Sequence, residues 1–431
     1  MIAIIFYGFF VLLTTAFVAD GIEILIRARA FNRNQLNLTK FRDEFIEKYD
    51  LDFTVILPAY RKPQEDLKRS IHSLLKAGIP KNQILVVDDF SDDQFKTAGT
   101  AAKLGVRVMS ISRNTKKVGA LKIAVDAINT KYVVLMDSDS VLLTNCDGLK
   151  RAINEMGLLG LDAMAGRVLP FHPSLKAGSE RSLAPEKKGL LLELQSLEYD
   201  QSMRLGRGSM YSVDAQSGSY RLKYAEVTCV SGAFGIFRTT VLRQVMTKIK
   251  EEFSGEDFER TLRILGINGK VGYSDNIVVL TSAPVNLVSH VKQRVEWSAG
   301  LFRCSFSKFG GTVCKRKRAG LTYLTNLIRD IIIHPLKLFS IPFLLLFYPI
   351  GFLSLIIFYT ALNFLVAKKL NIGNAAPTKA LLLLPFYKFY ISIVPTTIGY
   401  LKAFVYDVKL HTLSRNYRAL PIGIIREWNG R

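Results

Sequence analysis

The sequence predicts an α/β domain flanked by membrane helices, and three observations support this class. Between residues 52 and 310, continuous apolar stretches alternate with helical patterns, which is typical of a parallel sheet covered on both faces. Long uncharged runs stand near both ends of the chain, and acidic residues directly follow two of the apolar stretches. Ligands of open α/β sheets bind where the parallel strands end, so these acidic residues are the first functional candidates.

The first apolar run, residues 2–19, is long enough to cross a membrane. A signal peptide normally has a basic start and a small-residue cleavage site, and neither is convincing here, so we expect a retained membrane helix within residues 1–28. Arg27, Arg29 and Arg33 follow this run, and the positive-inside rule places its carboxyl end in the cytoplasm.

The second apolar region is expected to begin with an interfacial amphipathic helix at residues 318–340. Membrane helices are expected at 341–367 and 381–405, with a short external link between them, although the second could instead re-enter or lie in the interface. The basic tail, 406–431, is expected in the cytoplasm. The prediction is an integral protein of the plasma membrane with its central domain in the cytoplasm.

The net charge of +22 results from 58 basic and 36 acidic residues, and basic clusters such as 315–318 stand beside the membrane segments. Anionic membrane lipids attract such clusters, and no basic–aromatic surface motif indicates nucleic acid as a partner. The four cysteines have no CxxC spacing and are expected to be reduced thiols.

The central domain is expected to span residues 50–310. Its predicted strands are 53–57, 83–87, 106–109 and 132–136, and its predicted helices are 67–75, 119–128, 189–204 and 258–265. A flexible Gly/Ser stretch is expected after the third of these helices, up to about residue 220.

Asp137 and Asp139 follow the strand at 132–136. Side chains two residues apart in an extended chain point the same way, so both carboxylates can face one cation. Paired oxygen ligands without a neighbouring His or Cys suit Mg²⁺ or Mn²⁺ carrying a phosphate. The alternative for this short motif is a solvated turn.

Two motifs precede this pair. Asp88 and Asp89 end the strand at 83–87 and can accept hydrogen bonds from a base and a ribose, or they can form an Asx turn. Lys117 lies in a basic stretch at a helix start that can hold a diphosphate, or that is an ordinary basic loop.

Three motifs follow the pair. The stretch 229–234 is rich in small residues, which let a ligand approach the backbone. Asp257 opens a helix, where its carboxylate can serve as a general base or as an N-cap. Trp297 offers a flat apolar face to a sugar ring, or it is a headgroup-level Trp of the membrane interface.

In this order and spacing, the motifs resemble those of family 2 glycosyltransferases with the Rossmann-like GT-A fold. The resemblance covers roughly residues 50–310 and is greatest to membrane-embedded synthases of hyaluronan, chitin oligosaccharides, poly-N-acetylglucosamine and cellulose. It implies a UDP-sugar donor and a Mg²⁺ or Mn²⁺ ion. The implied donor-binding residues are Tyr60, Asp88, Asp89, Lys117 and Asp137, and the implied metal ligands are Asp137 and Asp139.

The resemblance also implies a base and an acceptor site. Asp257 matches the family's catalytic base, and Gln293 and Trp297 match two positions of the Q-x-x-R-W motif at the acceptor site. The remaining residues expected on the acceptor side are Ser231, Gly232 and Glu256.

The chain departs from the family pattern at Glu296, where the family has an Arg near the donor diphosphate. Arg294 or Arg303 is expected to take over that contact, and Glu296 is expected to pair with a basic group. Arg61 replaces the usual Asn after Pro-Ala-Tyr, and about three spans are fewer than many polymer-extruding members have. These departures bear on processive polymer synthesis more than on sugar transfer.

The resemblance therefore implies an inverting transferase that extends a polysaccharide at the membrane. One alternative is transfer of a single sugar to a polyprenyl phosphate or glycolipid. A second alternative is a non-catalytic membrane scaffold or sugar-nucleotide sensor.

Overall fold

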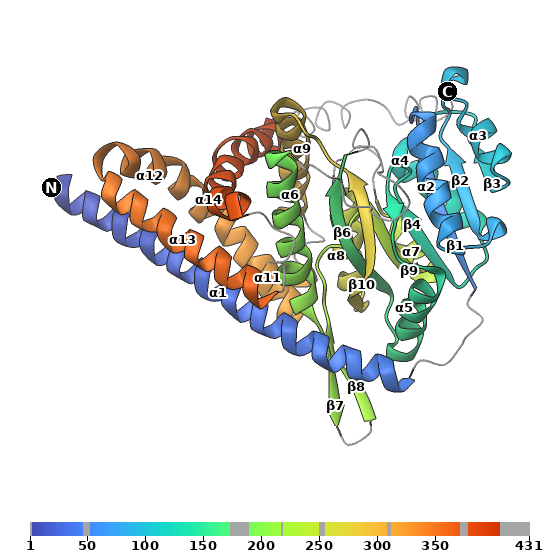
Figure 1. The fold of residues 1–431 in the computed structure, drawn as a ribbon, viewed down its shortest axis with the longest axis horizontal. Helices are drawn as coiled ribbons and strands as arrows, with labels where there is room; N and C mark the ends of the chain where they lie inside the picture. Colours follow the sequence, from blue (N-terminus) through green and yellow to red (C-terminus); the bar gives the residue numbers. More distant parts are fainter. Residues whose placement is uncertain are drawn as a thin grey trace, which may run out of the picture.

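The computed structural model describes residues 2–45, 52–172, 189–216, 219–249, 255–307, 312–370 and 378–405. An eight-stranded sheet with the order β3-β2-β1-β4-β9-β6-β10-β5 forms its centre (Figure 1). The strands of this sheet are β1 (Phe53–Ala59), β2 (Ile84–Asp88), β3 (Arg107–Ser110), β4 (Tyr132–Met136), β5 (Val141–Leu142), β6 (Ala163–Phe171), β9 (Phe234–Arg238) and β10 (Val271–Ser282).

The four strands predicted from the sequence pair in parallel, and β6 and β10 form a second parallel pair. β1 pairs in parallel with β2 and β4, and β2 pairs in parallel with β3. Every residue of β2 and β4 is buried, which explains their continuous apolar sequences. The pairing of Ala59 with Asp88 brings the carboxyl ends of β1 and β2 to the same edge.

The prediction of a parallel sheet is wrong for β9, which runs antiparallel to both β4 and β6. The physical reason is the place at which the chain enters β9. The amide of Asp137 donates to the carbonyl of Ala233 (3.2 Å), so the chain reaches β9 beside the carboxyl end of β4 and must run back from there. This reversal places residues 231–233 next to Asp137.

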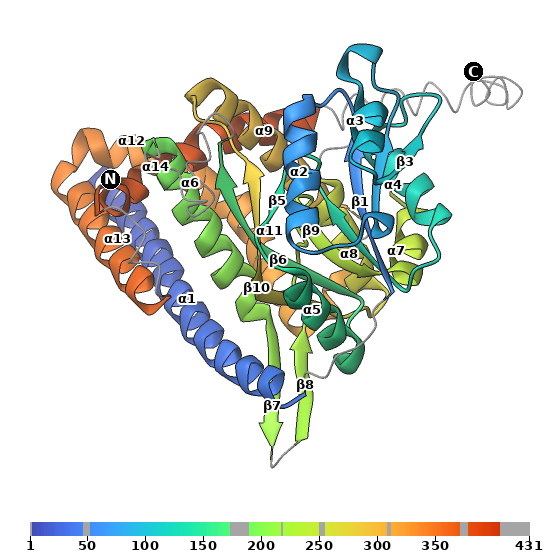
Figure 2. The same cartoon turned by 45° about the vertical axis from the view of Figure 1, so that its right-hand side comes forward.

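Helices cover both faces of the sheet (Figure 2). On one face, α4 packs against α7, and α7 packs against α8. Helices α2, α3 and α5 lie on the other face. Their bounds are α2 (Gln64–Lys76), α3 (Thr97–Lys103), α4 (Lys116–Ala127), α5 (Cys146–Leu159), α7 (Thr239–Met246) and α8 (Glu256–Gly266).

The predicted flexible stretch before residue 220 is instead largely ordered. α6 (Leu190–Gln201) continues through a π-helical segment, Ser202–Arg207, and a hairpin of β7 (Tyr211–Gln216) and β8 (Ser219–Ala225) follows. Asn37 on α1 donates to the Val213 carbonyl (3.1 Å), so the hairpin gains its order from a helix that is distant in the sequence.

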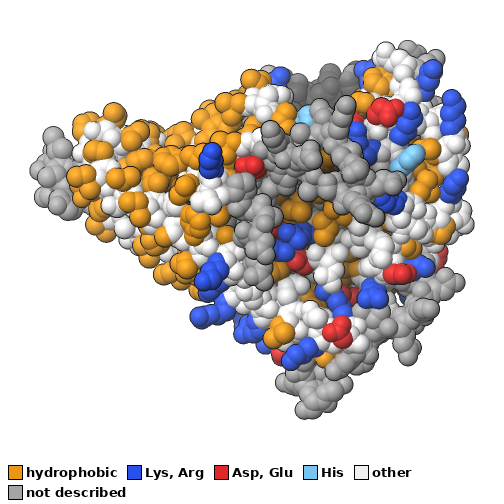
Figure 3. Space-filling view, in the orientation of Figure 1, with side chains coloured by type: hydrophobic (Ala, Val, Ile, Leu, Met, Phe, Trp, Pro, Cys, Tyr) orange, Lys and Arg blue, Asp and Glu red, His pale blue; other side chains and the backbone are white. Residues whose placement is uncertain are grey.

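Five further helices carry most of the apolar sequence. They are α1 (Ile2–Phe45), α11 (Lys317–Ile328), α12 (His334–Phe347) and α13 (Pro349–Lys369), followed by α14 (Thr378–Ile393). Within the described residues, three apolar helical stretches can cross a membrane by length and composition: Lys317–Phe347, Pro349–Lys369 and Thr378–Val405. Hydrophobic side chains cover the surface over α12, α13 and the amino-terminal part of α1, whereas charged ones lie over the later part of α1 and over the α/β domain (Figure 3).

The helix boundaries differ from those predicted. Residues 317–347 form one apolar stretch rather than a separate interfacial helix at 318–340, and the predicted span 341–367 is divided at Tyr348. Pro349 starts α13, since proline suits the first turn of a helix. Pro342 lies inside α12 without ending it.

The end of α13 lies against the catalytic domain. Asn32 Nδ2 donates to the Lys369 carbonyl (2.8 Å), and Arg204 Nη1 donates to the Leu370 carbonyl (2.7 Å). The first residues after this helix are therefore held beside the α/β domain, and most of the predicted external link lies outside the described residues. The predicted tail, 406–431, lies outside the described residues.

Candidate active site

A cavity of about 350 Å³ opens where β1, β2 and β4 end, at the edge predicted for ligand binding. Four of the predicted donor-side residues contribute to it: Tyr60, Asp89, Lys117 and Asp137. The other lining residues are Pro58, Ala59, Lys62, Asn114, Lys116, Ala120 and Ser138.

Asp88 and Asp89 have different environments. Asp88 Oδ1 accepts a hydrogen bond from the Ser91 amide (3.0 Å), which is the turn geometry weighed as an alternative for this motif. Asp89 Oδ1 accepts from the amide and the hydroxyl of Thr115 (2.7 and 2.8 Å). Asp89 Oδ2 is buried and has no hydrogen-bond partner among the described residues, so this oxygen is available to a ligand N–H or O–H.

Each carboxylate of the Asp137/Asp139 pair contacts a lysine. Lys117 Nζ lies 2.7 Å from Asp137 Oδ1 and 3.3 Å from Glu256 Oε1, and Lys62 Nζ lies 2.5 Å from Asp139 Oδ2. Sequence reasoning missed Lys62, although its place just after the end of β1 was a usable signal.

Electrostatics in this cluster are governed by burial and by Lys117. Burial raises the pKa of Asp137 and outweighs the opposing charge of Lys117. Burial also acts to raise the pKa of Glu256, but Lys117 and Arg260 outweigh it and hold that pKa below its ordinary value. Burial would lower the pKa of Lys117, but Asp137 and Glu256 raise it overall, so the ammonium stays charged.

Asp137 and Asp139 fit a hard divalent cation, because they present only oxygen donors beside the cavity. Within the described residues, no group of three or more His, Cys, Asp or Glu side chains is arranged to hold a metal ion. Any ion held here would therefore take most of its ligands from water and from the phosphates of a bound molecule, which is how Mg²⁺ is commonly bound.

Asp257 lies next to this cluster. Its Oδ2 accepts from the Gly232 amide (2.8 Å) and its Oδ1 from the Phe258 amide (2.8 Å). A Cβ on Gly232 would lie 3.1 Å from Lys117 Nζ, so glycine allows this close approach of loop, lysine and carboxylate. The predicted acceptor-side residues Gly232 and Glu256 thus meet Lys117, and the Ser231 hydroxyl accepts from the Ala233 amide (3.3 Å).

Helix α9 (Leu287–Ser305) carries Gln293, Arg294 and Trp297. Gln293 Oε1 is buried without a hydrogen-bond partner among the described residues, and Trp297 is 46% exposed. Glu296 pairs with Lys402, which confirms the expectation that it faces a basic group.

Arg294, which was predicted to bind the donor, pairs with an acidic residue in the structure. Its guanidinium forms a two-pronged ion pair with Glu198 on α6, and Arg294 does not line the cavity at the strand ends. Arg294 is buried and Glu198 is partly buried, so recruiting Arg294 to a diphosphate would leave the Glu198 carboxylate without this partner. A long-range ion pair of this kind leaves no signal in the local sequence.

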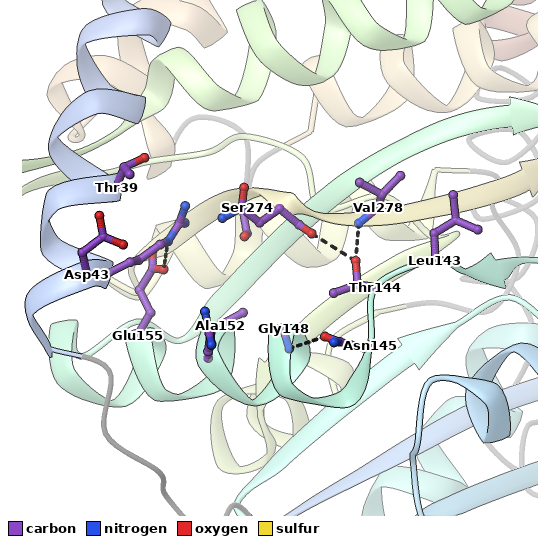
Figure 4. Close-up of a pocket in the computed structure, with 13 residues that line it drawn as sticks. Thr39, Asp43, Leu143, Thr144, Asn145, Gly148, Ala152, Glu155, Ser274 and Val278 are labelled. Carbon is purple, nitrogen blue, oxygen red and sulfur yellow. Dashed lines mark hydrogen bonds and ion pairs between the residues drawn. The ribbon is translucent and has the colours of Figure 1, made fainter.

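A larger cavity, of about 480 Å³, lies elsewhere, between α1, α5 and β10 (Figure 4). Its central charges neutralise each other, because Arg42 Nε lies 2.7 Å from Glu155 Oε2. None of the predicted site residues lines it. The smaller cavity, where the predicted residues converge, is therefore the candidate active site.

Comparisons with known proteins indicate the family and the fold of the chain. The family described as "Glycosyl transferase family 2" matches residues 54–245, and "Glycosyl transferase family group 2" matches residues 194–370. No curated protein matches the sequence. Among solved structures, the chain is similar to the mannosyltransferase PcManGT from Pyrobaculum calidifontis, in complex with GDP-Man and Mn²⁺. The identity is 13%, the alignment covers 90% of this chain and 98% of that one, and the TM-score of 0.52 supports the same fold.

Proposed function

The chain belongs to glycosyltransferase family 2, and we propose that it transfers a sugar from a nucleotide-sugar donor to an acceptor at the membrane. The observation that carries the proposal is the convergence of Asp89, Lys117, Asp137 and Asp257 around the strand ends. As a glycosyltransferase of family 2 the chain is an enzyme, which argues against a non-catalytic scaffold or sensor.

The donor is proposed to bind in the 350 Å³ cavity. Asp89 Oδ2 accepts an N–H of the base or a ribose hydroxyl, since it is the unsatisfied oxygen there. Lys117 and Lys62 are the cations nearest to a diphosphate beside Asp137 and Asp139. A UDP-sugar is the first choice. Because both bases present N–H donors, a GDP-sugar such as that bound by the similar mannosyltransferase is the second.

Asp257 is proposed to take the proton of the acceptor hydroxyl. The acceptor oxygen attacks the anomeric carbon, the bond from that carbon to the diphosphate breaks on the opposite side, and the nucleoside diphosphate leaves with the electron pair. Lys117 and Lys62 offset the charge of the departing diphosphate. Asp137 and Asp139 would hold a Mg²⁺ or Mn²⁺ ion, which supplies Lewis-acid stabilisation of that leaving group when bound.

The acceptor is proposed to approach from α9, where Gln293 and Trp297 lie. Gly255, which directly precedes α8 and its Asp257, packs against Gly300 of α9. This contact links α9 to the proposed base. A growing polysaccharide is the first choice, as for the resembling synthases. The apolar helices beside α9 also suit a polyprenyl phosphate or glycolipid that receives a single sugar.

The test is incubation of the membrane-embedded protein with UDP-glucose, UDP-N-acetylglucosamine, UDP-glucuronate and GDP-mannose plus Mn²⁺. Release of UDP or GDP and the size of the sugar product are measured, with EDTA as control. We expect release from donors of one base only, abolished by EDTA. Release from none of the four donors would overturn the proposal, and a single-sugar lipid product would favour the second acceptor.

A further inference from the structure

Arg294 is anchored between three elements that meet beside the apolar helices. Its two terminal nitrogens lie 2.6 and 2.7 Å from the Glu198 oxygens on α6, and its Nε donates to His290 Nε2 (3.2 Å) on α9. Burial and the charge of Arg294 lower the pKa of His290 to about 4, so the imidazole is neutral and can accept this bond. Tyr387 of α14 donates to Glu198 Oε2 (2.8 Å) and fixes the carboxylate from the other side.

The anchored guanidinium lies against an aromatic pair. Arg294 Cζ is 4.6 Å from the centre of the Trp297 ring and 5.7 Å from the centre of the Tyr199 ring. The two rings are 5.9 Å apart and inclined by 52°. The ring quadrupole of an indole attracts a guanidinium that lies over its face. Because Arg294 is held in place, this attraction restricts the position of the Trp297 ring. Trp297 is nevertheless half exposed, with ring surface left for a ligand.

Two unsatisfied polar atoms accompany this ring. The Tyr199 hydroxyl and Gln293 Oε1 are buried and have no hydrogen-bond partner among the described residues, and Tyr199 is only 6% exposed. Buried polar atoms normally have hydrogen-bond partners, so two unpartnered atoms on residues that neighbour an exposed indole indicate a ligand that is rich in hydroxyl groups. A pyranose ring combines an apolar face for the indole with such hydroxyls.

We propose that Glu198 and Arg294 are positioning residues that hold Trp297 as the platform for an acceptor sugar, and that Tyr199 is a further acceptor-binding residue. The acceptor part rests on the proposed function, whereas the positioning part does not. Glu198 acts only through Arg294 and Trp297, and Arg294 meets the acceptor only through the ring. Tyr199 offers its hydroxyl directly.

The test uses the intrinsic fluorescence of Trp297. The chain has two tryptophans, so a Trp428→Phe background leaves Trp297 alone. Glu198→Gln, Arg294→Met and Arg294→Lys are compared for acrylamide quenching of Trp297. Glu155→Gln and Arg42→Met are the matched controls, because they break another buried Arg–Glu pair, remote from α9. Binding of chitotetraose and cellotetraose is then followed by the same fluorescence.

We expect Glu198→Gln and Arg294→Met to raise the acrylamide quenching constant at least twofold, and Arg294→Lys to raise it less, since it keeps the charge. Oligosaccharide binding should weaken at least fivefold in Glu198→Gln and in Tyr199→Phe, with quenching unchanged in Tyr199→Phe. The control variants should change neither quantity, even if they unfold at a lower temperature.

Quenching in Glu198→Gln and Arg294→Met that equals that of the controls would overturn the positioning role. Unchanged oligosaccharide binding in Tyr199→Phe would overturn the role of its hydroxyl. A parent protein that responds to neither oligosaccharide would overturn the acceptor assignment of Trp297, while the quenching comparison would still decide the positioning role.

Discussion

At the scale of single residues, Asp257 has the most demanding double role. It accepts two backbone amides, which fix its carboxylate at the start of α8, and it is proposed as the base. Asp257→Asn should lower turnover by about a hundredfold or more, because an amide cannot take the proton. Binding of the nucleoside diphosphate, measured by calorimetry, should survive. If binding collapses together with turnover, Asp257 is a structural cap.

Lys117 bridges Asp137 and Glu256, so its loss would leave two carboxylates beside the donor diphosphate. Lys117→Met should weaken nucleotide binding by about tenfold or more, since a charge-assisted contact is replaced by repulsion. Lys103→Met, an exposed lysine on α3, is the control and should bind normally. Equal affinity of the two variants would remove Lys117 from the donor site.

At the scale of elements, α8 depends on a glycine contact. Gly255 has φ of +93°, and a Cβ there would lie 3.0 Å from the Gly300 Cα on α9. Gly255→Ala should therefore cost about 1–3 kcal/mol of stability and reduce turnover by displacing Asp257. Thermal unfolding and turnover are measured together. Gly99→Ala, with nothing within 4 Å of its new Cβ, should preserve both, and a similar result for Gly255→Ala would show that this contact is unimportant.

Elements with strong local patterns were predictable from the sequence. β4 was predicted with its observed bounds, and β1, β2 and α8 nearly so, because burial on both faces or one amphipathic face dictates their composition. β9 was not predicted as a strand, and its direction depends on where the chain enters the sheet and not on the strand's own sequence.

Part of the candidate site was also predictable from the sequence. Asp89, Lys117 and Asp137 were found because motifs at the ends of parallel strands converge wherever the sheet forms. The interaction of Arg294 with Glu198 joins residues 96 positions apart, and only the assembled helices reveal it. Lys62 was not predicted, because it follows β1 whereas its partner, Asp139, follows β4.

At the scale of the whole molecule, the structure suggests how the chain is placed in a membrane. Tyr348, at the bend between α12 and α13, packs against Phe10 near the start of α1, whereas the end of α13 contacts Arg204 of the catalytic domain. The apolar helix after α13 runs beside α6 and α9. Its Lys388 donates a hydrogen bond to Gln201 on α6, and its Lys402 forms an ion pair with Glu296 on α9. These contacts support a topology in which the bend faces away from the catalytic domain.

This topology predicts the labelling of single cysteines in a background without the four native ones. Ile350→Cys, at the exposed start of α13, should react with an impermeant maleimide from outside the cell. Asn374→Cys, in the connection to α14, should be protected until the membrane is permeabilised. Labelling of position 374 from outside would contradict the arrangement and restore an external link.

The central claim is that Asp137 and Asp139 mark the site where a nucleotide sugar is consumed. The most direct measurement is metal-dependent release of nucleoside diphosphate by wild type, Asp139→Asn and Asp126→Asn, all embedded in membrane. Asp126 is a 63% exposed carboxylate on α4 and makes the matched control. We expect wild type and Asp126→Asn to turn over equally, and Asp139→Asn to lose activity by about a hundredfold or more while retaining its thermal unfolding temperature. Full activity of Asp139→Asn, or undiminished turnover in EDTA, would contradict the account.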